Sequence, residues 1–202
     1  MNNFVFVQAR MGSSRLPGKT LKPLGNYPLI WYVIERLRKI DNISDVVILT
    51  SDLGKDDILV RWCDENKVSV FRGSEDNVLQ RYYAAAIHYS ADNIVRATGD
   101  NPFVDYEAAT SLLRDHLAWQ ADYSSNKAEI CSSLPDGLGV EIFSFPALKK
   151  SLDLSGEPRH FEHVNEYILE NKQDFGIFTD AMAGGLYDYS HIRLTVDTQE
   201  DF

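Results

Sequence analysis

Short apolar runs that are typical of buried strands alternate along this chain with segments whose apolar residues repeat at helical spacing. Residues 4–7 form the first apolar run, and residues 28–40 carry the first helical repeat. The same patterns predict further strands over residues 46–49, 68–71, 94–97, 140–143 and 192–196, and further helices over residues 56–66, 77–89, 105–116 and 159–171. Such alternation is typical of right-handed crossovers between parallel strands. We therefore expect an α/β fold with a mainly parallel sheet that helices cover on both faces.

No feature of the sequence divides the chain into two domains. Its 202 residues are 44% hydrophobic, and they contain no internal repeat or long linker. That supply of apolar residues is enough for one sizeable core, so we expect a single domain over residues 1–202. Residues 197–201 are typical of a helix start with Thr198 as its cap. Because the chain stops there, we expect that it is truncated or that a final helix is missing.

The composition restricts the partners and the compartment. The chain has 20 basic and 30 acidic residues, a net charge of −10, so broad binding to nucleic acid or to anionic membranes is not expected. Only Cys63 and Cys131 occur, which excludes a disulfide framework and an all-cysteine zinc site. Neither a basic leader nor an apolar stretch of membrane-spanning length is present. We therefore expect a cytoplasmic protein.

The loop after the first predicted strand is unusually cationic for so acidic a chain. It carries Arg10, Arg15 and Lys19 together with two glycines and two serines. Exposed backbone N–H groups and cationic side chains are the groups that bind phosphates. The alternative is a solvated surface loop without a ligand. Three cations at the first strand-to-helix turn favour the phosphate site.

This loop is not a P-loop. Gly12 and Gly18 are separated by five residues rather than four, and Pro17 lacks an amide hydrogen. A shift of one residue changes which N–H groups face a phosphate. Ser13 and Ser14 lack the Gly-x-Ser-x-Gly pattern of a nucleophile elbow, so we do not expect them to be nucleophiles.

Two aspartates follow predicted strands. Asp100 comes after the strand over residues 94–97, and Asp197 comes after the strand over residues 192–196. In one parallel sheet both carboxylates lie at the carboxyl edge, where the cationic loop also emerges and where ligands bind. Mg²⁺ takes one or two carboxylates together with phosphates and water, so the pattern points to Mg²⁺–nucleotide chemistry. The alternative is that each aspartate only caps a helix, and for Asp52 we favour capping.

Two histidines lie close together on one predicted helix. His160 and His163 flank Glu162 within residues 159–171, which could form part of a metal-binding face. No third ligand stands at a useful spacing. Contact of His163 with a bound ligand is therefore the favoured interpretation.

Several motifs of the chain resemble those of a known family, the sugar-acid cytidylyltransferases, which include the CMP-Kdo and CMP-sialate synthetases. Residues 8–19 closely resemble the signature loop of that family. Further similar motifs follow in family order over residues 72–82, 96–102, 136–143, 162–164 and 196–201. The spore-coat polysaccharide biosynthesis branch is the most similar. Asn77 stands where many members have Asp.

The resemblance implies a fold and a reaction. The fold is the Rossmann-like, GT-A-like sandwich of three layers found in nucleotide-diphospho-sugar transferases, commonly as a homodimer. The reaction joins CMP from CTP to a sugar acid such as Kdo or a sialic acid-like sugar, and it releases pyrophosphate. Such products feed the synthesis of surface polysaccharides or glycans. The implied cofactor is Mg²⁺, held by Asp100 and Asp197.

The resemblance also implies residue roles. Arg10 and Lys19 would hold phosphates, with Arg15 assisting. The whole expected nucleotide site comprises Gln8, Ala9, Arg10, Gly12, Ser13, Arg15, Lys19, Arg72, Asn77 and Arg81. Glu141 and His163 would face the sugar. A carboxylated sugar needs a cationic partner, for which the candidates are Arg159, His160 and His163.

Two other functions stay open from the sequence. One is a glycosyltransferase of the same fold that uses a ready-made nucleotide-sugar. Such enzymes commonly hold metal with a paired Asp-x-Asp, whereas Asp100 is followed by Asn101 and Pro102. The other is an inactive homologue that only binds nucleotide.

Overall fold

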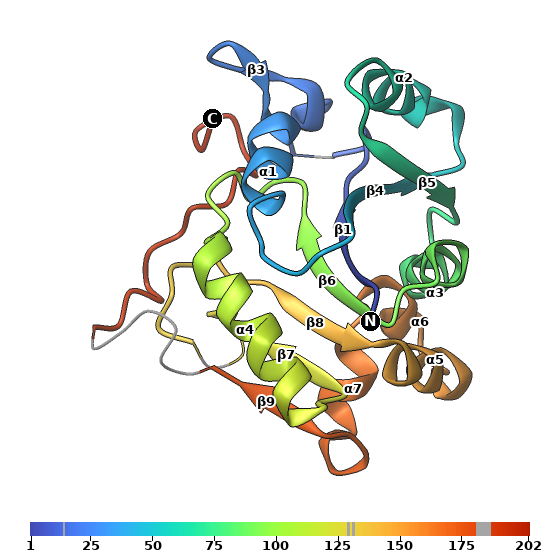
Figure 1. Ribbon diagram of the computed structural model, residues 1–202. Coiled ribbons are helices and arrows are strands. Elements are labelled where there is room, and N and C mark those ends of the chain that lie inside the picture. Colours follow the sequence, from blue (N-terminus) through green and yellow to red (C-terminus); the bar gives the residue numbers. More distant parts are fainter. Residues whose placement is uncertain (14, 129, 131, 181–186) are drawn as a thin grey trace.

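One mixed sheet dominates the computed structural model, which describes residues 1–13, 15–128, 130, 132–180 and 187–202 (Figure 1). Within these residues the order of its strands is β5-β4-β1-β6-β8-β7-β9. β1, β4, β5 and β6 run parallel, and β8 runs antiparallel to its neighbours β6 and β7. Their bounds are β1 Asn3–Gln8, β4 Asp45–Ser51, β5 Ser69–Gly73, β6 Asn93–Thr98, β7 Tyr123–Ser125, β8 Glu141–Ser144 and β9 Ile177–Thr179. The expected α/β fold with a mainly parallel sheet is confirmed.

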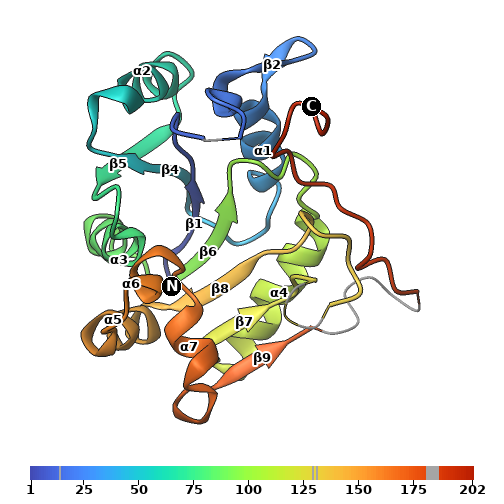
Figure 2. The same ribbon diagram turned by 180° about the vertical axis from the view of Figure 1, so that it is seen from behind.

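Helices cover both faces of the sheet, as Figures 1 and 2 show from opposite sides. On one face lie α1 Leu29–Leu37, α2 Asp57–Glu65 and α4 Tyr106–Trp119. On the other lie α3 Val78–Tyr89, α5 Phe145–Leu154, α6 Pro158–Glu162 and α7 Glu166–Glu170. The 3₁₀ turns are η1 Lys19–Leu21, η2 Gly54–Asp56 and η3 Lys172–Asp174, and a small hairpin pairs β2 Pro23–Leu24 with β3 Tyr27–Pro28.

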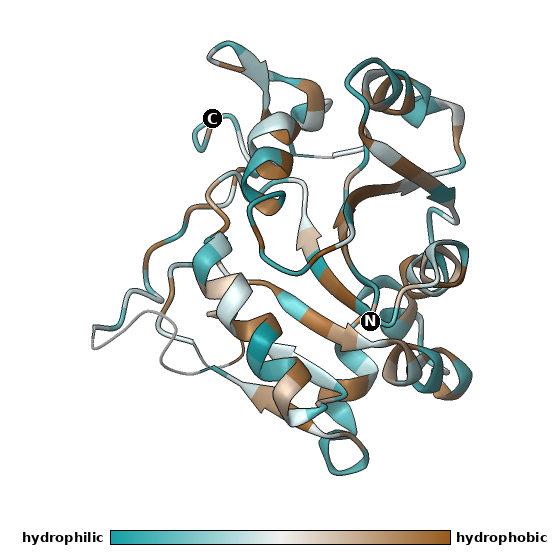
Figure 3. Ribbon diagram, viewed as in Figure 1, coloured by the Kyte–Doolittle hydropathy of each residue, from teal (hydrophilic) through white to brown (hydrophobic). Residues whose placement is uncertain are grey.

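The alternation of side chains along β1 shows how the two cores form. Val5 and Val7 pack with the helices of the first face, whereas Phe4 and Phe6 pack with those of the second. Successive side chains of a strand point to opposite faces, so a strand buried on both faces reads as one apolar run. Figure 3 shows the result, since β1 and β4 are mostly brown while the helices carry both colours.

Polar side chains begin three of the helices, as N-caps do. Asp105 accepts hydrogen bonds of 3.0 Å from the amides of Glu107 and Ala108, and so it caps α4. Asn77 accepts a hydrogen bond of 2.8 Å from the amide of Gln80 at the start of α3. Ser144 caps α5 in the same way. None of the described helices is long and apolar enough to cross a lipid bilayer.

Two predicted elements are wrong. Residues 159–171 form two short helices rather than one, because the backbone of His163 is extended and ends α6. Residues 192–196 form no strand among the described residues, only an isolated bridge between Asp136 and Arg193. The segment crosses the carboxyl end of β6 instead, where the amide of Val196 donates to the carbonyl of Asp100 at 2.9 Å. Residues 198–201 form a turn. Ser14 and Cys131 lie outside the described residues.

The chain reverses its direction across the sheet at β1. β4 and β5 lie on one side of β1, and β6 lies on the other. The loops that follow β1 and β6 emerge side by side at the carboxyl ends of these two strands, where the amide of Gly99 donates to the carbonyl of Gln8 at 2.9 Å. Open α/β sheets bind ligands in a crevice at this edge.

Candidate active site

A cavity of about 240 Å³ lies in this crevice, at the carboxyl ends of β1 and β6. Asp100 and Asp197 line it from one side. The loop after β1 lines it from the other side with residues that the sequence assigned to a nucleotide site: Gln8, Ala9, Arg10, Gly12, Ser13, Arg15 and Lys19. The cationic loop and the two aspartates therefore lie around one cavity, as the sequence predicts. The expected strand before Asp197 is absent from the described residues.

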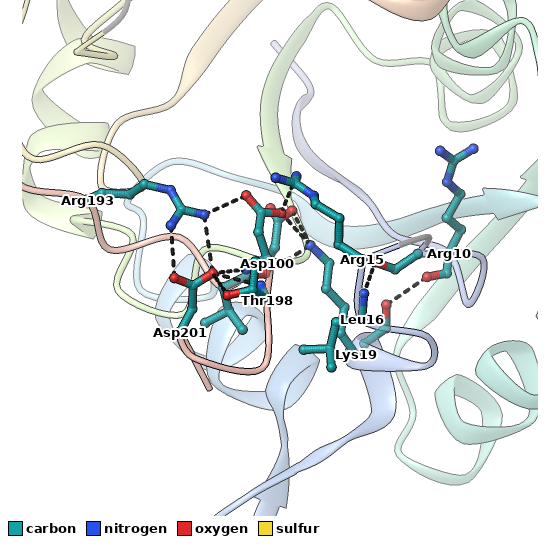
Figure 4. A network of polar contacts seen from close by, with 12 residues as sticks. Arg10, Arg15, Leu16, Lys19, Asp100, Arg193, Thr198 and Asp201 are labelled. Carbon is teal, nitrogen blue, oxygen red and sulfur yellow. Dashed lines mark hydrogen bonds and ion pairs between the residues drawn. The ribbon is translucent and has the colours of Figure 1, made fainter.

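Lys19 is the residue on which contacts from both sides of the cavity converge (Figure 4). Its ammonium donates to Asp100 Oδ2 at 2.8 Å, to the carbonyl oxygen of Val196 at 2.9 Å and to Asp197 Oδ1 at 3.0 Å. Only 13% of the Lys19 side chain is exposed. Three oxygen atoms of two separate segments thus converge on one poorly solvated cation, where charge-assisted hydrogen bonds are strong.

Asp197 is surrounded by cations. Besides Lys19, its carboxylate contacts Arg15 at 2.9 Å and Arg193 at 2.8 Å. Burial by itself raises the pKa of Asp197, but the hydrogen bonds from Lys19 and Arg193 outweigh that effect and bring the pKa below its ordinary value. The carboxylate is therefore ionised at neutral pH.

The loop that carries these cations is held at both ends. Near its start, the amide of Met11 donates to Asp56 Oδ1 at 2.7 Å, and the hydroxyl of Thr20 donates to the carbonyl of Arg10 at 2.8 Å. Near its end, Gly18 has a φ of 71°, in the left-handed region that glycine adopts without strain. These contacts give the cations fixed positions in the crevice.

Arg10 lines the cavity but points away from Asp100 (Figure 4). Its guanidinium donates to Glu75 Oε1 at 3.0 Å, and Lys55 donates to the same oxygen at 2.8 Å. Lys55 also lies against Gly12, where an added Cβ would come within 2.9 Å of its ammonium. Lys55 is thus a further cation beside the loop, and sequence reasoning missed it because it lies far along the chain, in η2.

Three predicted nucleotide residues lie away from the cavity. Arg72 pairs with Asp57 at 2.7 Å, and Asn77 caps α3. Arg81 is buried, and its guanidinium donates to the carbonyl of Ser74 at 2.6 Å. Arg72 thus connects β5 to α2, whereas Asn77 and Arg81 hold the start of α3 and the segment before it. None of the three is among the described residues that line the cavity.

A second cavity of about 470 Å³ adjoins the first. The two share Arg15, Thr98, Asp100 and Asp197 as lining residues. The second cavity adds a further set of side chains that can bind an anion: Arg96, Lys127, His163 and Arg193.

Its wall also holds buried polar atoms without a hydrogen-bond partner in the described part of the chain. They are Arg96 Nε, Asn101 Oδ1 and Thr195 Oγ1. Buried polar atoms are normally hydrogen-bonded, so these three atoms are exceptions among the residues that line the second cavity.

Glu141 and Arg159, assigned to the sugar from the sequence, are not among the described residues that line the second cavity. Glu141 is 1% exposed and lies behind Arg96, with which it forms an ion pair, and Tyr123 donates to it at 2.6 Å. Arg159 is exposed and pairs with Glu170 at 2.8 Å. Strand β8 turns Glu141 inward, and the exposed face of α6 carries Arg159 outward.

His160 also belongs to the helix packing rather than to the cavity. Its Nε2 lies 2.9 Å from Glu170 Oε2, and its side chain is buried. Within the described residues no group of three or more His, Cys, Asp and Glu side chains is placed to hold a metal ion.

The oxygen atoms around Lys19 fit a hard cation. Asp100, Asp197 and the carbonyl of Val196 already converge on one positive charge. Carboxylate and carbonyl oxygens are the ligands that Mg²⁺ prefers, usually with phosphates and water completing the set. The residues present are therefore suitable for Mg²⁺ when a nucleotide supplies the remaining oxygens.

Comparison with known proteins agrees with this geometry. Residues 4–202 match a family described as cytidylyltransferase. The spore coat polysaccharide biosynthesis protein SpsF of Bacillus subtilis is 35% identical over 100% of this chain and 84% of its own length. The 3-deoxy-manno-octulosonate cytidylyltransferase 2 of Hydrogenovibrio crunogenus is 31% identical over 94% of this chain and 75% of its own length.

A solved structure of a cytidylyltransferase from Leptospira borgpetersenii superimposes on this chain with a TM-score of 0.92 and 35% identity. The likeness covers 100% of this chain and 83% of that one. The fold expected from the signature loop is thereby confirmed. With the match over residues 4–202, these similarities show that the chain belongs to the cytidylyltransferase family.

Proposed function

We propose that this protein transfers the CMP group of CTP to a small sugar acid and releases pyrophosphate. The observation that carries the proposal is the pair of adjoining cavities that share Asp100, Asp197 and Arg15. A transfer between two substrates needs two sites with one common wall, at which the reacting atoms meet. The relative named as a 3-deoxy-manno-octulosonate cytidylyltransferase supports a sugar acid as the acceptor.

The first cavity takes the triphosphate of CTP in this proposal. Lys19 and Arg15 lie on its wall, and their cationic groups are suited to phosphate oxygens. Arg10 joins them by exchanging its contact with Glu75 for a phosphate. Because about 46% of the Arg10 side chain is exposed, this exchange meets little steric resistance.

Asp100 and Asp197 would hold Mg²⁺ together with the phosphates. When bound, the ion offsets the negative charge that develops on the phosphate oxygens. Lys19 has two roles in this scheme, since its ammonium both contacts the carboxylates and lies where the leaving phosphates would pass. The residues act by position and charge, as in other phosphoryl-group transfers.

The acceptor occupies the second cavity. Arg96, Lys127 and Arg193 lie on its wall and suit the carboxylate of an acidic sugar, and His163 adds a hydrogen-bonding group. The acceptor hydroxyl gives its proton to water while its oxygen forms a bond to the α-phosphorus. The bond from that phosphorus to the oxygen shared with the β-phosphate breaks, and its electron pair stays with the pyrophosphate. Pyrophosphate then leaves along the side of Lys19 and Arg15.

The test is release of pyrophosphate from CTP, UTP, GTP and ATP with a panel of sugar acids, with and without Mg²⁺. We expect release only with CTP, an acidic sugar and Mg²⁺ together. Asp100→Asn should lower the rate by at least about a hundredfold, because it removes a charge from the reacting centre. Release of a nucleoside diphosphate from a nucleotide-sugar would instead indicate a glycosyltransferase. Nucleotide binding without release of either product would indicate an inactive homologue.

A further inference from the structure

The carboxylate of Asp201 organises the segment that carries Asp197. Asp201 Oδ2 accepts hydrogen bonds from the amide of Asp197 at 2.8 Å, and from the amide and the hydroxyl of Thr198 at 2.7 Å and 3.1 Å. Figure 4 shows this carboxylate between the turn and Arg193. One side chain thus fixes the backbone on which Asp197 stands.

Arg193 connects the carboxylates of Asp201 and Asp197. Its Nη1 donates to Asp201 Oδ1 at 2.9 Å, and its Nη2 donates to Asp201 Oδ2 at 3.3 Å and to Asp197 Oδ2 at 2.8 Å. A guanidinium is planar and rigid, so two carboxylates on one fork have a fixed mutual orientation.

This arrangement fixes the orientation of the Asp197 carboxylate beside the first cavity. Oδ2 is held by Arg193, and Oδ1 is the atom that contacts Lys19 at 3.0 Å and Arg15 at 2.9 Å. If Arg193 were released, the Asp197 carboxylate could rotate about its terminal torsion. That rotation would break the convergence of oxygens on Lys19.

The same turn rests on the cationic loop. Phe202 packs against a buried cluster that contains Leu16 and Leu29, and the Lys22 ammonium lies 4.9 Å from the centre of the Phe202 ring. Lys22 also donates to Gln199. Figures 1 and 2 agree in placing this end of the chain beside α1. The turn is therefore held in two ways. Asp201 accepts hydrogen bonds from its backbone, and Phe202 packs against the apolar cluster.

We propose that Asp201 is a positioning residue that, through Arg193 and the turn over residues 197–201, holds the Asp197 carboxylate in the orientation that the transfer needs. This inference rests on the function proposed above. Asp201 lines neither of the two cavities just described, so its role is indirect. Groups behind a ligand-holding side chain commonly set its orientation in this way.

The test compares Asp201→Ala and Asp201→Asn with Glu200→Gln in the full chain. Glu200 is exposed in the same turn, so its substitution removes one negative charge from the same place without removing the contacts of Asp201. Asp201→Asn loses the same charge as Asp201→Ala but keeps an oxygen that can accept from the turn amides. The three variants therefore separate charge from position.

Three measurements are made on each variant. Hydrogen exchange at the amides of Asp197 and Thr198 reports the turn, binding of Mn²⁺ in the presence of CTP reports the carboxylate, and steady-state rates report the transfer. For Asp201→Ala we expect faster exchange at both amides, about tenfold weaker Mn²⁺ binding and about tenfold lower kcat, with KM for CTP changed less than about twofold. Asp201→Asn should recover part of these losses, and Glu200→Gln should match the unaltered protein.

Three results would contradict the positioning role, and one of them would also contradict the proposed function. If the unaltered protein binds Mn²⁺ with CTP and Asp201→Ala binds it equally well, with faster exchange at the two amides, the positioning role is wrong and the proposed function stands. If the unaltered protein binds neither CTP nor Mn²⁺ with CTP, the proposed function is wrong and the positioning role falls with it. Equal losses in Asp201→Ala and Glu200→Gln would mean that charge rather than position matters, which also overturns the inference.

Discussion

The carboxylate of Asp56, at the end of η2, accepts a hydrogen bond of 2.7 Å from the backbone amide of Met11, in the cationic loop after β1. Asp56 is fully buried, and it also accepts from the amide of Ser51 at 3.2 Å and from the Ser51 hydroxyl. Asp56, which follows β4, therefore fixes the start of the loop that follows β1, the strand next to β4. The positions of the cations in this loop depend on this contact.

Replacement of Asp56 by alanine should destabilise the protein by about 2–4 kcal/mol, because it leaves the buried donors of Ser51 and the partly buried amide of Met11 without an acceptor. The free energy of unfolding in urea measures the loss. The control is Asp52→Ala, which removes an exposed carboxylate close by in the chain. The capping role expected for Asp52 is wrong, since the N-cap residues of η2 and α2 are Leu53 and Asp56, and neither helix has a side-chain cap. Its substitution should therefore change the free energy by less than about 0.5 kcal/mol. Equal stability of the two variants would mean that the Asp56 contact contributes little.

The contribution of Asp56 should also depend on pH. Burial by itself raises the pKa of this carboxyl, but hydrogen bonds from Ser51 and Met11 outweigh it and bring the pKa below the ordinary value of 3.8. A carboxyl whose pKa is lowered by folding stabilises the protein above its unfolded pKa, and this stabilisation is lost as the pH falls through the folded value. The difference in unfolding free energy between the unaltered protein and Asp56→Ala should be constant from about pH 5 to 7 and should shrink below about pH 3.8.

His116 should produce a second loss of stability in a higher pH range. It is buried in α4, where its ring contacts Ser124 Oγ at 2.8 Å and Asn93 Oδ1 at 3.3 Å. Burial lowers its pKa from 6.5 to about 4. As the pH falls from 6.5 towards 4, the unfolded chain binds a proton that the folded protein does not, so stability falls by up to about 3 kcal/mol.

His116→Gln removes this titrating group, so its unfolding free energy should fall less steeply over the same pH range. Urea unfolding of both proteins at several pH values measures the two slopes. The ring signals of His116 in an NMR titration give an independent check. A ring that titrates near its unfolded pKa of 6.5 would contradict the prediction.

Local sequence patterns account for the places of Asp100 and Asp105 but not for the segment around Val196. The apolar run over residues 94–97 predicted β6, and so it placed Asp100 at the carboxyl edge, where it lies. Asp105 has the side chain of an N-cap, and it caps α4. In both cases a local pattern decides the local structure. Val196 was predicted to lie in a strand, but long-range contact with Asp100 bends its segment across the sheet.

The elements that the sequence did not predict depend on tertiary contacts. β7 is fully buried although it contains Ser124 and Ser125, because partners elsewhere satisfy them, such as His116 for Ser124. Periodicity cannot detect a buried strand made of polar residues. For the same reason no local pattern marked Arg96 or Arg193 as lining residues, since each becomes one only when the segments around the second cavity are assembled.

The ion pair of Arg96 with Glu141 should behave as a coupled unit. Glu141 is 1% exposed and Arg96 10%. Burial by itself raises the pKa of Glu141, but the Arg96 guanidinium and Lys127 outweigh that effect and lower it. Arg96→Met should therefore cost about 3–5 kcal/mol, because it leaves a buried carboxylate without its main partner.

The double variant of Arg96→Met with Glu141→Gln should be more stable than Arg96→Met alone, because it removes the unpaired charge. Unfolding free energies of both single variants and of the double variant give the coupling between the two side chains. A double variant whose loss equals the sum of the two single losses would show that the two side chains act independently.

Lys19→Met should change metal binding and nucleotide binding in opposite directions. Methionine keeps most of the side-chain stem and removes the ammonium that now contacts Asp100, Asp197 and the carbonyl of Val196. Without that competing cation the same oxygens should bind Mn²⁺ more tightly when no nucleotide is present. Because the variant also lacks the phosphate contact proposed for Lys19, kcat/KM for CTP should fall by about a hundredfold. Lys172→Met, at an exposed lysine in η3, is the control and should change neither quantity. Weaker Mn²⁺ binding by Lys19→Met, or an unchanged kcat/KM, would contradict the role given to this ammonium, because a cation that shares its oxygens with a metal must compete with it.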